Sequence, residues 1–355
     1  MTRSPALSRR VALTAGAATA ISAVTTPGHA AKPSQLRVLS MNIWFGGTAV
    51  EPGPSLVADV IRATGADVVM LSESGDTTRW LADHLSQNGS RWHYAESSDT
   101  GILSRHPIVE RGTLPFTTKA VIDLAGRQVA VYALHLEYRW YATYLPRGYA
   151  AGVPEGPYSG WDQLPGGPVT DVETVLQVNE ESGRPAVVAQ VIADAERERA
   201  TRRSVLIGGD FNEPSILDWT AATAEEQDHR GLVVPWQSTG LLRDAGYVDA
   251  YRAKYPNPST HPGTTWPTSN RAKPLDHLTW TPKADERDRI DYVFASPSPG
   301  VKLLDVGLVG TAETIIRNER VPMRTNDFLQ IFSHWPTDHQ AVLATYRIAG
   351  PPARR

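Results

Sequence analysis

The chain of 355 residues contains no cysteine, which excludes disulfide bonds and thiolate metal ligands. Long apolar runs are also missing, because no segment after residue 30 reaches the length of a membrane-spanning helix. The sequence has no repeat of fixed period, and no long basic run that could hold a nucleic-acid backbone by charge alone. Stability must therefore come from an apolar core, and the length is enough for one large domain or two small ones.

The first 30 residues are predicted to be an export signal. Residues 8–11 read S-R-R-V, an alanine-rich apolar run covers residues 11–24, and residues 27–30 offer a small-x-small cleavage site. The apolar run is too short to span a membrane, so this pattern is typical of a twin-arginine signal, with a disordered tail as the alternative. The signal holds three arginines and no acid, so its removal lowers the formal charge from −3 to a mildly acidic value. We therefore expect residues 31–355 to be secreted, to the extracellular space or the cell envelope.

Hydrophobic periodicity predicts strands that alternate with helices early in the chain and strands that predominate later. The expected strands are 36–44, 67–73, 101–104, 120–124, 128–136, 205–210, 289–294, 302–309 and 339–348. The expected helices are 55–64, 77–87, 184–202 and most of 238–251. This order predicts one α/β domain with mixed sheets and no internal linker, over residues 31–355.

The stretch S-V-L-I-G-G-D-F-N-E-P, residues 204–214, predicts a strand buried on both faces that ends in chemistry-bearing side chains. Gly208 and Gly209 let the backbone approach another segment closely. Asp210 and Asn212 are two positions apart, so they face the same way in an extended chain, and Phe211 faces the core. Ligand sites of open α/β sheets lie at such carboxyl ends of strands. A polar turn that caps backbone groups would have the same residue pattern.

Other buried strands also start or stop on polar side chains, and together they suggest one site. These side chains are Asn42, Glu73, His135, Asp291, Asp338 and His339. Each alone is more typical of a turn or of a hydrogen-bonded core residue. Asp291 lies inside an apolar run and needs a partner if it is buried.

The series M-N-I-W, L-S-E-S, A-L-H-L, G-D-F-N, R-I-D-Y-V-F and T-D-H, in this order, resembles the endonuclease/exonuclease/phosphatase family. This family contains pancreatic-type deoxyribonuclease, bacterial sphingomyelinases and inositol-phosphate phosphatases. The resemblance runs from about Leu36 to Ile348, and its most specific part is G-D-F-N with a later D-H. It implies an α/β sandwich of two packed mixed β-sheets flanked by helices, a deoxyribonuclease-like four-layer architecture with the site along one edge.

The resemblance also implies a metal site. Glu73 and Asp338 would bind Mg²⁺, with Mn²⁺ as an alternative, because hard cations prefer carboxylate oxygens. Asn42 would lie at the same metal and orient a water or a phosphate oxygen. No second metal ion is predicted or excluded by the sequence.

Five further residues receive catalytic roles from the resemblance. Asp210 and Asn212 would position and activate the attacking water. His135 would donate to a phosphoryl oxygen as negative charge builds there. His339, held by Asp291, would act at the same phosphate. The implied reaction is metal-assisted hydrolysis of a phosphate ester, expected to be a diester, without a covalent enzyme intermediate.

Residues 137–170 lack periodicity and hold many aromatic side chains, which predicts a functional loop insertion. We expect a substrate-gripping rim there, with a self-packed loop as the alternative. The rim residues would be Tyr138, Arg139, Trp140, Tyr141, Tyr144 and Arg147. Trp266 could line the same site, since the family often has a tryptophan loop at that point.

The sequence leaves the substrate open among a small molecule, a phospholipid and a nucleic acid, and a secreted nuclease is the nearest alternative function. The A-L-H-L-E run differs from the N-x-Y-x-P run of the abasic-site branch, which argues against DNA repair. No stable nucleic-acid complex is expected. An alternative of another class is a non-catalytic module that binds glycans or lipids. A calcineurin-like phosphoesterase would need a G-N-H-D run, which this chain lacks.

Overall fold

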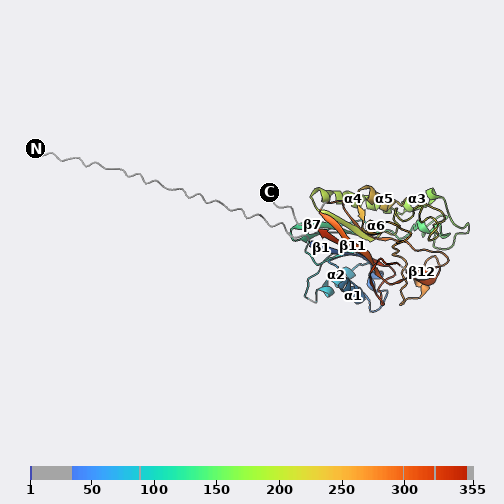
Figure 1. The fold of residues 1–355 in the computed structure, drawn as a ribbon, viewed down its shortest axis with the longest axis horizontal. Helices are drawn as coiled ribbons and strands as arrows, with labels where there is room; N and C mark the ends of the chain where they lie inside the picture. Colours follow the sequence, from blue (N-terminus) through green and yellow to red (C-terminus); the bar gives the residue numbers. More distant parts are fainter. Residues whose placement is uncertain (2–33, 88, 299, 324, 350–355) are drawn as a thin grey trace.

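The computed structural model describes Met1 and residues 34–349, except residues 88, 299 and 324. The expected export signal therefore lies outside the described residues, apart from Met1. Two β-sheets pack face to face, and helices cover the outer face of each sheet (Figure 1). This arrangement confirms the predicted four-layer sandwich.

The first sheet has seven strands in the order β14-β11-β15-β1-β2-β4-β3. They are β1 (Ser34–Asn42), β2 (Val68–Ser72), β3 (His93–Glu96), β4 (Gly101–Ser104), β11 (Val301–Gly310), β14 (Phe328–Ile331) and β15 (Ala341–Ile348). The sheet is mixed, since β1 pairs parallel to β2 and antiparallel to β15.

The second sheet has six strands in the order β5-β6-β7-β8-β10-β9. They are β5 (Ile108–Leu114), β6 (Thr117–Leu124), β7 (Arg127–His135), β8 (Ser204–Asp210), β9 (Val248–Asp249) and β10 (Asp291–Ala295). It is also mixed, because β8 runs parallel to β7 and antiparallel to β10. A separate hairpin is formed by β12 (Glu313–Ile316) and β13 (Glu319–Pro322).

The helices lie on the outer faces because alternate residues of the central strands point outward. On β8, Leu206 faces the other sheet, whereas Val205 and Ile207 pack against the helix α4 (Arg184–Ala200). In the same way, α1 (Pro54–Thr64) and α2 (Thr77–Ser86) pack on the first sheet. α5 (Gln237–Asp244) lies beside α4 (Figure 1). The remaining helices are α3 (Val172–Glu181), α6 (Ala250–Lys254), η1 (Phe45–Gly47), η2 (Ala142–Tyr144) and η3 (Leu275–His277).

Several elements differ from the expected ones. The helix predicted across residues 238–251 is α5, which ends at Asp244, followed by β9 and α6. The predicted last strand begins at Ala341 rather than at His339. The short elements α3, β3, β5, β12, β13 and β14 are additional. Most are short or partly exposed, so their apolar periodicity is weak. None of the helices in the described part of the chain has the length and apolarity that crossing a bilayer requires.

The 137–170 insertion is compact and has cores of its own. One cluster joins it to α3 and to the buried tryptophans Trp219 and Trp236. A second cluster joins its tyrosines to Trp266 and Ile290, which lies next to β10. The insertion therefore packs against the end of the second sheet at which β10 begins.

Candidate active site

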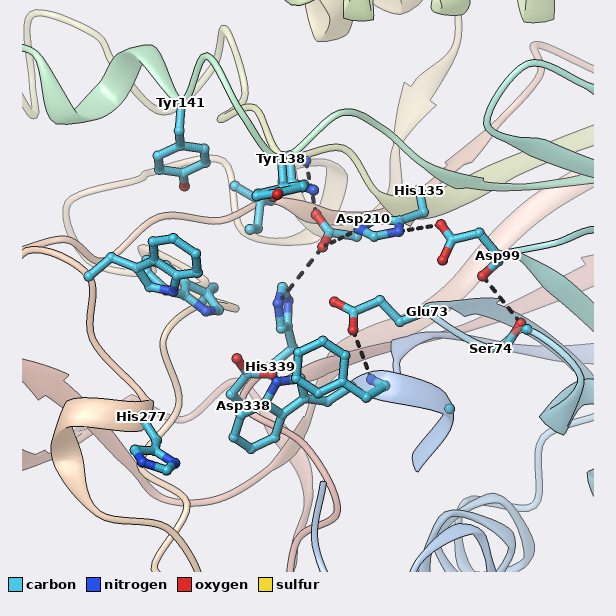
Figure 2. Close-up of a pocket in the computed structure, with 18 of the residues that line it drawn as sticks. Glu73, Ser74, Asp99, His135, Tyr138, Tyr141, Asp210, His277, Asp338 and His339 are labelled. Atoms are coloured by element: carbon cyan, nitrogen blue, oxygen red, sulfur yellow. Dashed lines mark hydrogen bonds and ion pairs between the residues drawn. The ribbon is translucent and has the colours of Figure 1, made fainter. Parts of the chain in front are cut away.

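A cavity of about 950 Å³ opens where the ends of the two sheets meet the insertion. Its lining includes predicted site residues from both sheets: Glu73, His135, Asp210, Asn212, Asp338 and His339 (Figure 2). Tyr138 and Trp266, two of the three predicted substrate contacts, line it as well. The remaining predicted catalytic and metal-site residues, Asn42 and Asp291, lie directly behind this lining and contact it.

Strand register places three of these residues in one row across the second sheet. His135 ends β7 and lies opposite Asp210, which ends β8. Asp210 in turn lies opposite Asp291, the first residue of β10. Residues separated by up to 156 positions in the sequence are thus brought together by backbone pairing alone.

The two glycines before Asp210 are needed for close approach. Gly209 has a φ of +130°, and a Cβ there would lie 2.0 Å from the carbonyl oxygen of Leu134. A Cβ on Gly208 would lie 2.3 Å from the Cε of Met70, in the other sheet. Both distances are far below van der Waals contact, so this close packing of β8 requires glycine at each position.

Side chains from the first sheet connect directly to Asp210. The amide nitrogen of Asn42 donates to Asp210 Oδ2 and to Glu73 Oε1, each at 3.0 Å. The amide oxygen of Asn42 accepts from the backbone N–H of Trp44 at 2.9 Å. Ser72 Oγ accepts the backbone N–H of Asp210 at 3.1 Å. Asn42 therefore bridges the two carboxylates through its nitrogen, and its oxygen is engaged by the backbone.

Two imidazole–carboxylate pairs flank Asp210, and Figure 2 shows one of them, His135 with Asp99. His339 Nδ1 lies 2.9 Å from Asp291 Oδ2, so the predicted pairing of these residues is present. His135 Nδ1 lies 2.5 Å from Asp99 Oδ2. The Nε2 atoms of both rings lie 3.8 Å from the same oxygen, Asp210 Oδ2. With Nδ1 engaged in each ring, Nε2 is the nitrogen available to a ligand.

The carboxylates favour the charged form of both imidazoles. Burial alone would lower the pKa of His135, but the hydrogen bond to Asp99 and the charge of Asp210 raise it to about 9. Burial also opposes charge on His339, and the nearby Asp291 and Asp210 raise its pKa to about 10. The pKa of the buried Asp210 is raised by desolvation and by the charge of Asp291. The site thus combines cationic donors with a carboxylate of increased basicity.

Glu73 and Asp338 supply the oxygen donors that a divalent cation would need. Burial, and then the charge of Glu73, raise the pKa of Asp338 to about 6. Within the described residues, neither carboxylate forms an ion pair with a lysine or arginine. Two carboxylates that face one cavity without a lysine or arginine partner fit a hard divalent cation.

A second set of donors is also close enough to hold a metal ion. Ligand atoms of Asp210, Asp291 and His339 lie within 4.8 Å of one another. In this set, however, the His339 ring is already hydrogen-bonded to Asp291. That contact engages only Nδ1 and leaves Nε2 free. The described residues therefore offer two candidate donor sets for a divalent cation, this cluster and the pair of Glu73 and Asp338.

Asn212 is placed by a turn rather than by strand alternation. Its φ is +46°, and its backbone N–H donates to Asp210 Oδ1 at 2.9 Å. The side-chain nitrogen donates to the carbonyl oxygen of Leu136 at 2.9 Å. Phe211 points into the core, as predicted. Asn212 therefore lines the cavity, although the chain is not extended at this residue.

The insertion forms an aromatic wall, but only part of the predicted rim faces the cavity. Tyr138, Tyr141 and Tyr144 line it, with Tyr141 and Tyr144 buried in the wall. The prediction that Arg147 belongs to the rim is wrong, because this residue does not line the cavity. Its guanidinium is buried and donates to both carboxylate oxygens of Asp288, at 2.6 and 3.1 Å.

Two other predicted rim residues point elsewhere. Arg139 does not line the cavity and pairs with Glu137, with Nη2 2.9 Å from Oε2. Trp140 packs with the core of the insertion. The difference arises because arginines and tryptophans in an unpatterned loop give no periodicity from which their direction can be read.

Several lining residues gave no detectable sequence signal. They are Phe45, Asp76, Asp99, Trp161, Asp276, His277 and Trp280. Asp99 lies in the loop between β3 and β4, where the carbonyl oxygen of Asp99 accepts the backbone N–H of Ser74 at 2.8 Å. An isolated aspartate in S-S-D-T is indistinguishable from a turn former in sequence.

The chain is similar to known proteins. The model of the Endonuclease/Exonuclease/phosphatase family matches residues 39–339. An uncharacterized protein of Caenorhabditis elegans, F14F9.5, is 29% identical over 325 residues, which cover 88% of this chain and 91% of that protein.

Two solved structures are also similar to this chain. An endonuclease/exonuclease/phosphatase from Beutenbergia cavernae is 18% identical, with a TM-score of 0.50 over 90% of this chain and 73% of that chain. Danio rerio TDP2 complexed with a single-strand DNA product is 16% identical, with a TM-score of 0.48 over 88% of this chain and 99% of that chain.

The fold and site define a two-sheet α/β sandwich with a carboxylate and imidazole cluster at one edge, the architecture of phosphoester hydrolases of this type. The chain belongs to the endonuclease/exonuclease/phosphatase family. The resemblance inferred from its motifs is thereby confirmed.

Proposed function

We propose that this protein is a Mg²⁺-dependent phosphodiesterase that hydrolyses its substrate by direct attack of water. The observation that carries the proposal is the position of Asp210 Oδ2, which lies 3.8 Å from the Nε2 atoms of both His135 and His339. That spacing is too long for a hydrogen bond and leaves the three groups facing one small volume. A phosphoryl group in that volume would meet one proton acceptor and two proton donors.

Each residue then has one task in the reaction. As the oxygen of the water attacks phosphorus, Asp210 accepts a proton from that water. The amide of Asn42 holds the Asp210 carboxylate in place. His135 donates from Nε2 to a non-bridging phosphoryl oxygen and stabilises its growing charge. The ester P–O bond breaks, and His339 Nε2 protonates the departing alcohol oxygen. The Nδ1 bonds to Asp99 and Asp291 hold both rings in position for these transfers.

Glu73 and Asp338 are the residues that would hold the divalent cation. When bound, the cation supplies charge that attracts and polarises the phosphate. Glu73 is oriented for this role because its Oε2 accepts the backbone N–H of Phe45 at 2.8 Å and its Oε1 accepts from Asn42.

The test is hydrolysis of bis(4-nitrophenyl) phosphate by the purified protein with Mg²⁺, with Asp210→Ala and His339→Ala as blanks. We expect 4-nitrophenol release that chelation by EDTA abolishes and that both variants reduce at least a hundredfold, the scale of one general acid–base group. Equal release by wild type and both variants would contradict the assignment. It would leave the non-catalytic glycan- or lipid-binding module as the better interpretation.

We also propose that the protein works outside the cytoplasm, after twin-arginine export. The support is the S-R-R-V pattern with its short apolar run and small-residue cleavage site in residues 8–30. Replacement of Arg9 and Arg10 by lysine should retain the precursor inside cells that express the full chain. Equal amounts of processed protein outside the cytoplasm for wild type and this variant would contradict export by this route.

A further inference from the structure

The lining of the active-site cavity is unusually acidic and contains no lysine or arginine among the described residues. Six carboxylates line it: Glu73, Asp76, Asp99, Asp210, Asp276 and Asp338. Two cations lie next to lining residues without being part of the lining. Arg139 pairs with Glu137, and Lys273 Nζ lies 5.9 Å from the ring centroid of Trp44.

This lining has too little positive charge for more than one phosphate group. One divalent cation and all three lining imidazoles, each protonated, would supply at most five positive charges against the six carboxylates. A phosphodiester adds one negative charge at the reacting centre. A second phosphate would add more negative charge to a lining that is already in negative excess and that holds no lysine or arginine to pair with it. Proteins that track a polynucleotide present lysines and arginines along the backbone, and this cavity does not.

The same cavity offers aromatic rings in place of cations. The lining rings are Trp44, Phe45, Tyr138, Tyr141, Tyr144, Trp161, Trp266 and Trp280. At its mouth, Phe45 is 71% exposed, Tyr138 51% and Trp280 44%. Behind them the rings support each other, with the centroids of Trp161 and Trp280 4.5 Å apart at 69°. Exposed rings on a packed wall are a surface on which an apolar or planar organic group can be buried.

Resting on the proposed function, we infer that the substrate is a small phosphodiester that carries a single phosphate and an organic group held between these rings. The charge of the lining disfavours polynucleotides and esters with further phosphates. The selection therefore comes from two independent features: the surplus of carboxylates, which repels a second phosphate, and the aromatic wall, which binds the organic part.

Three chromogenic esters that release the same 4-nitrophenol separate these features. Thymidine 3′-(4-nitrophenyl phosphate) has one phosphate and a planar base. Its 5′-phosphorylated form differs only by the added phosphate, and methyl 4-nitrophenyl phosphate lacks the base. At low ionic strength we expect kcat/KM to be at least tenfold lower for the 5′-phosphorylated ester than for its parent. The difference should shrink as salt rises, because exposed charges are screened over about 10 Å at 0.1 M.

Two exposed carboxylates away from the reacting centre test the charge effect. Asp76 and Asp276 are exposed, and neither side chain has a hydrogen bond or ion pair in the described structure. The double variant Asp76→Asn/Asp276→Asn should reduce the discrimination at least threefold. The matched control is Asp59→Asn on the far face of α1, which should leave the ratio unchanged.

Trp280→Ala tests the aromatic wall. It should raise KM for the thymidine ester at least threefold and change KM for the methyl ester by less than half that factor. Equal kcat/KM for the 5′-phosphorylated ester and its parent, or a preference for the phosphorylated ester, would overturn the inference and leave the phosphodiesterase function intact. Absence of hydrolysis of all three esters would instead overturn the proposed function, on which the inference rests.

Discussion

His135 Nδ1 lies 2.5 Å from Asp99 Oδ2, and this pair repeats on one side of Asp210 what His339 and Asp291 form on the other. Both rings are held through Nδ1 and present Nε2 to the same carboxylate oxygen. The two pairs differ in environment, because the Asp99 side chain is 47% exposed whereas Asp291 is fully buried. Asp99 can therefore be altered with little effect on the core.

Asp99→Asn is expected to lower kcat by roughly tenfold to a hundredfold with little change in KM. The amide cannot stabilise a charged imidazole, so the pKa of His135 falls and the ring loses its fixed orientation. Steady-state kinetics on bis(4-nitrophenyl) phosphate would measure this, and the alkaline limb of the pH profile should move to lower pH. Asp83→Asn, an exposed aspartate of α2, is the control and should match wild type. An unchanged kcat for Asp99→Asn would contradict a role for this pair.

His339 and Asp291 are expected to act as one unit. His339→Ala and Asp291→Asn should each lower kcat by roughly 10² to 10³, and the double variant should lose little more than the worse single one. The physical reason is that Asp291 contributes through the ring it holds, so it has nothing to support once the ring is gone. Losses that multiply in the double variant would show that the two residues act independently.

Metal affinity of variants should show which donor set binds the cation, Glu73 with Asp338 or the cluster of Asp210, Asp291 and His339. Glu73→Gln and Asp338→Asn should each weaken Mn²⁺ binding at least tenfold, because each removes a charged oxygen donor. Asp291→Asn should change it less than threefold. Isothermal titration calorimetry of the folded variants measures the Mn²⁺ affinity independently of activity. Weakening by Asp291→Asn alone would instead assign the ion to the cluster of Asp210, Asp291 and His339.

The site residues at strand ends were predictable from the sequence, because the apolar pattern of a strand shows where that strand ends. Asp210 follows three aliphatic residues and two glycines, and its partners His135 and Asp291 also lie at strand ends, so a shared sheet edge could be inferred. Asp99 could not be inferred, since its place depends on a loop folded by hydrogen bonds to Ser74, a neighbour in space only.

The insertion shows the same limit for a larger segment. Its aromatic content indicates an ordered loop but holds no information about the direction of each side chain. Tyr138 faces the cavity, whereas Arg147 turns inward to Asp288, 141 residues away. Such tertiary ion pairs leave no local pattern, because neither partner lies on a periodic element.

The buried pair of Arg147 and Asp288 should be far more important for stability than the exposed pair of Arg139 and Glu137. Arg147→Met is expected to lower the free energy of unfolding by about 3 to 5 kcal/mol, because it leaves the buried Asp288 carboxylate uncompensated. Arg139→Met, in a pair whose arginine is 42% exposed, should lower it far less, because water screens an exposed ion pair. Urea denaturation of both variants would measure the difference. Similar losses for the two would show that Asp288 is compensated by other groups, such as the hydroxyl of Tyr141.

His229 should make the protein sensitive to acid. The ring is buried and stacked on Trp219, with centroids 3.7 Å apart, and burial together with the charge of Arg147 lowers its pKa to about 3. Above the unfolded pKa of roughly 6.5, both states are neutral and the residue contributes no pH dependence. Below it, the unfolded chain binds a proton that the folded chain does not, so stability falls until the pH nears 3. At pH 4 the loss from this residue is about 3 kcal/mol. His229→Phe keeps a stacking ring without a titrating group. Between pH 7 and pH 4, the unfolding free energy of wild type should therefore fall by about 3 kcal/mol more than that of the variant. Chemical denaturation at both pH values measures it, and a difference that stays constant would show that His229 takes up its proton in the folded state.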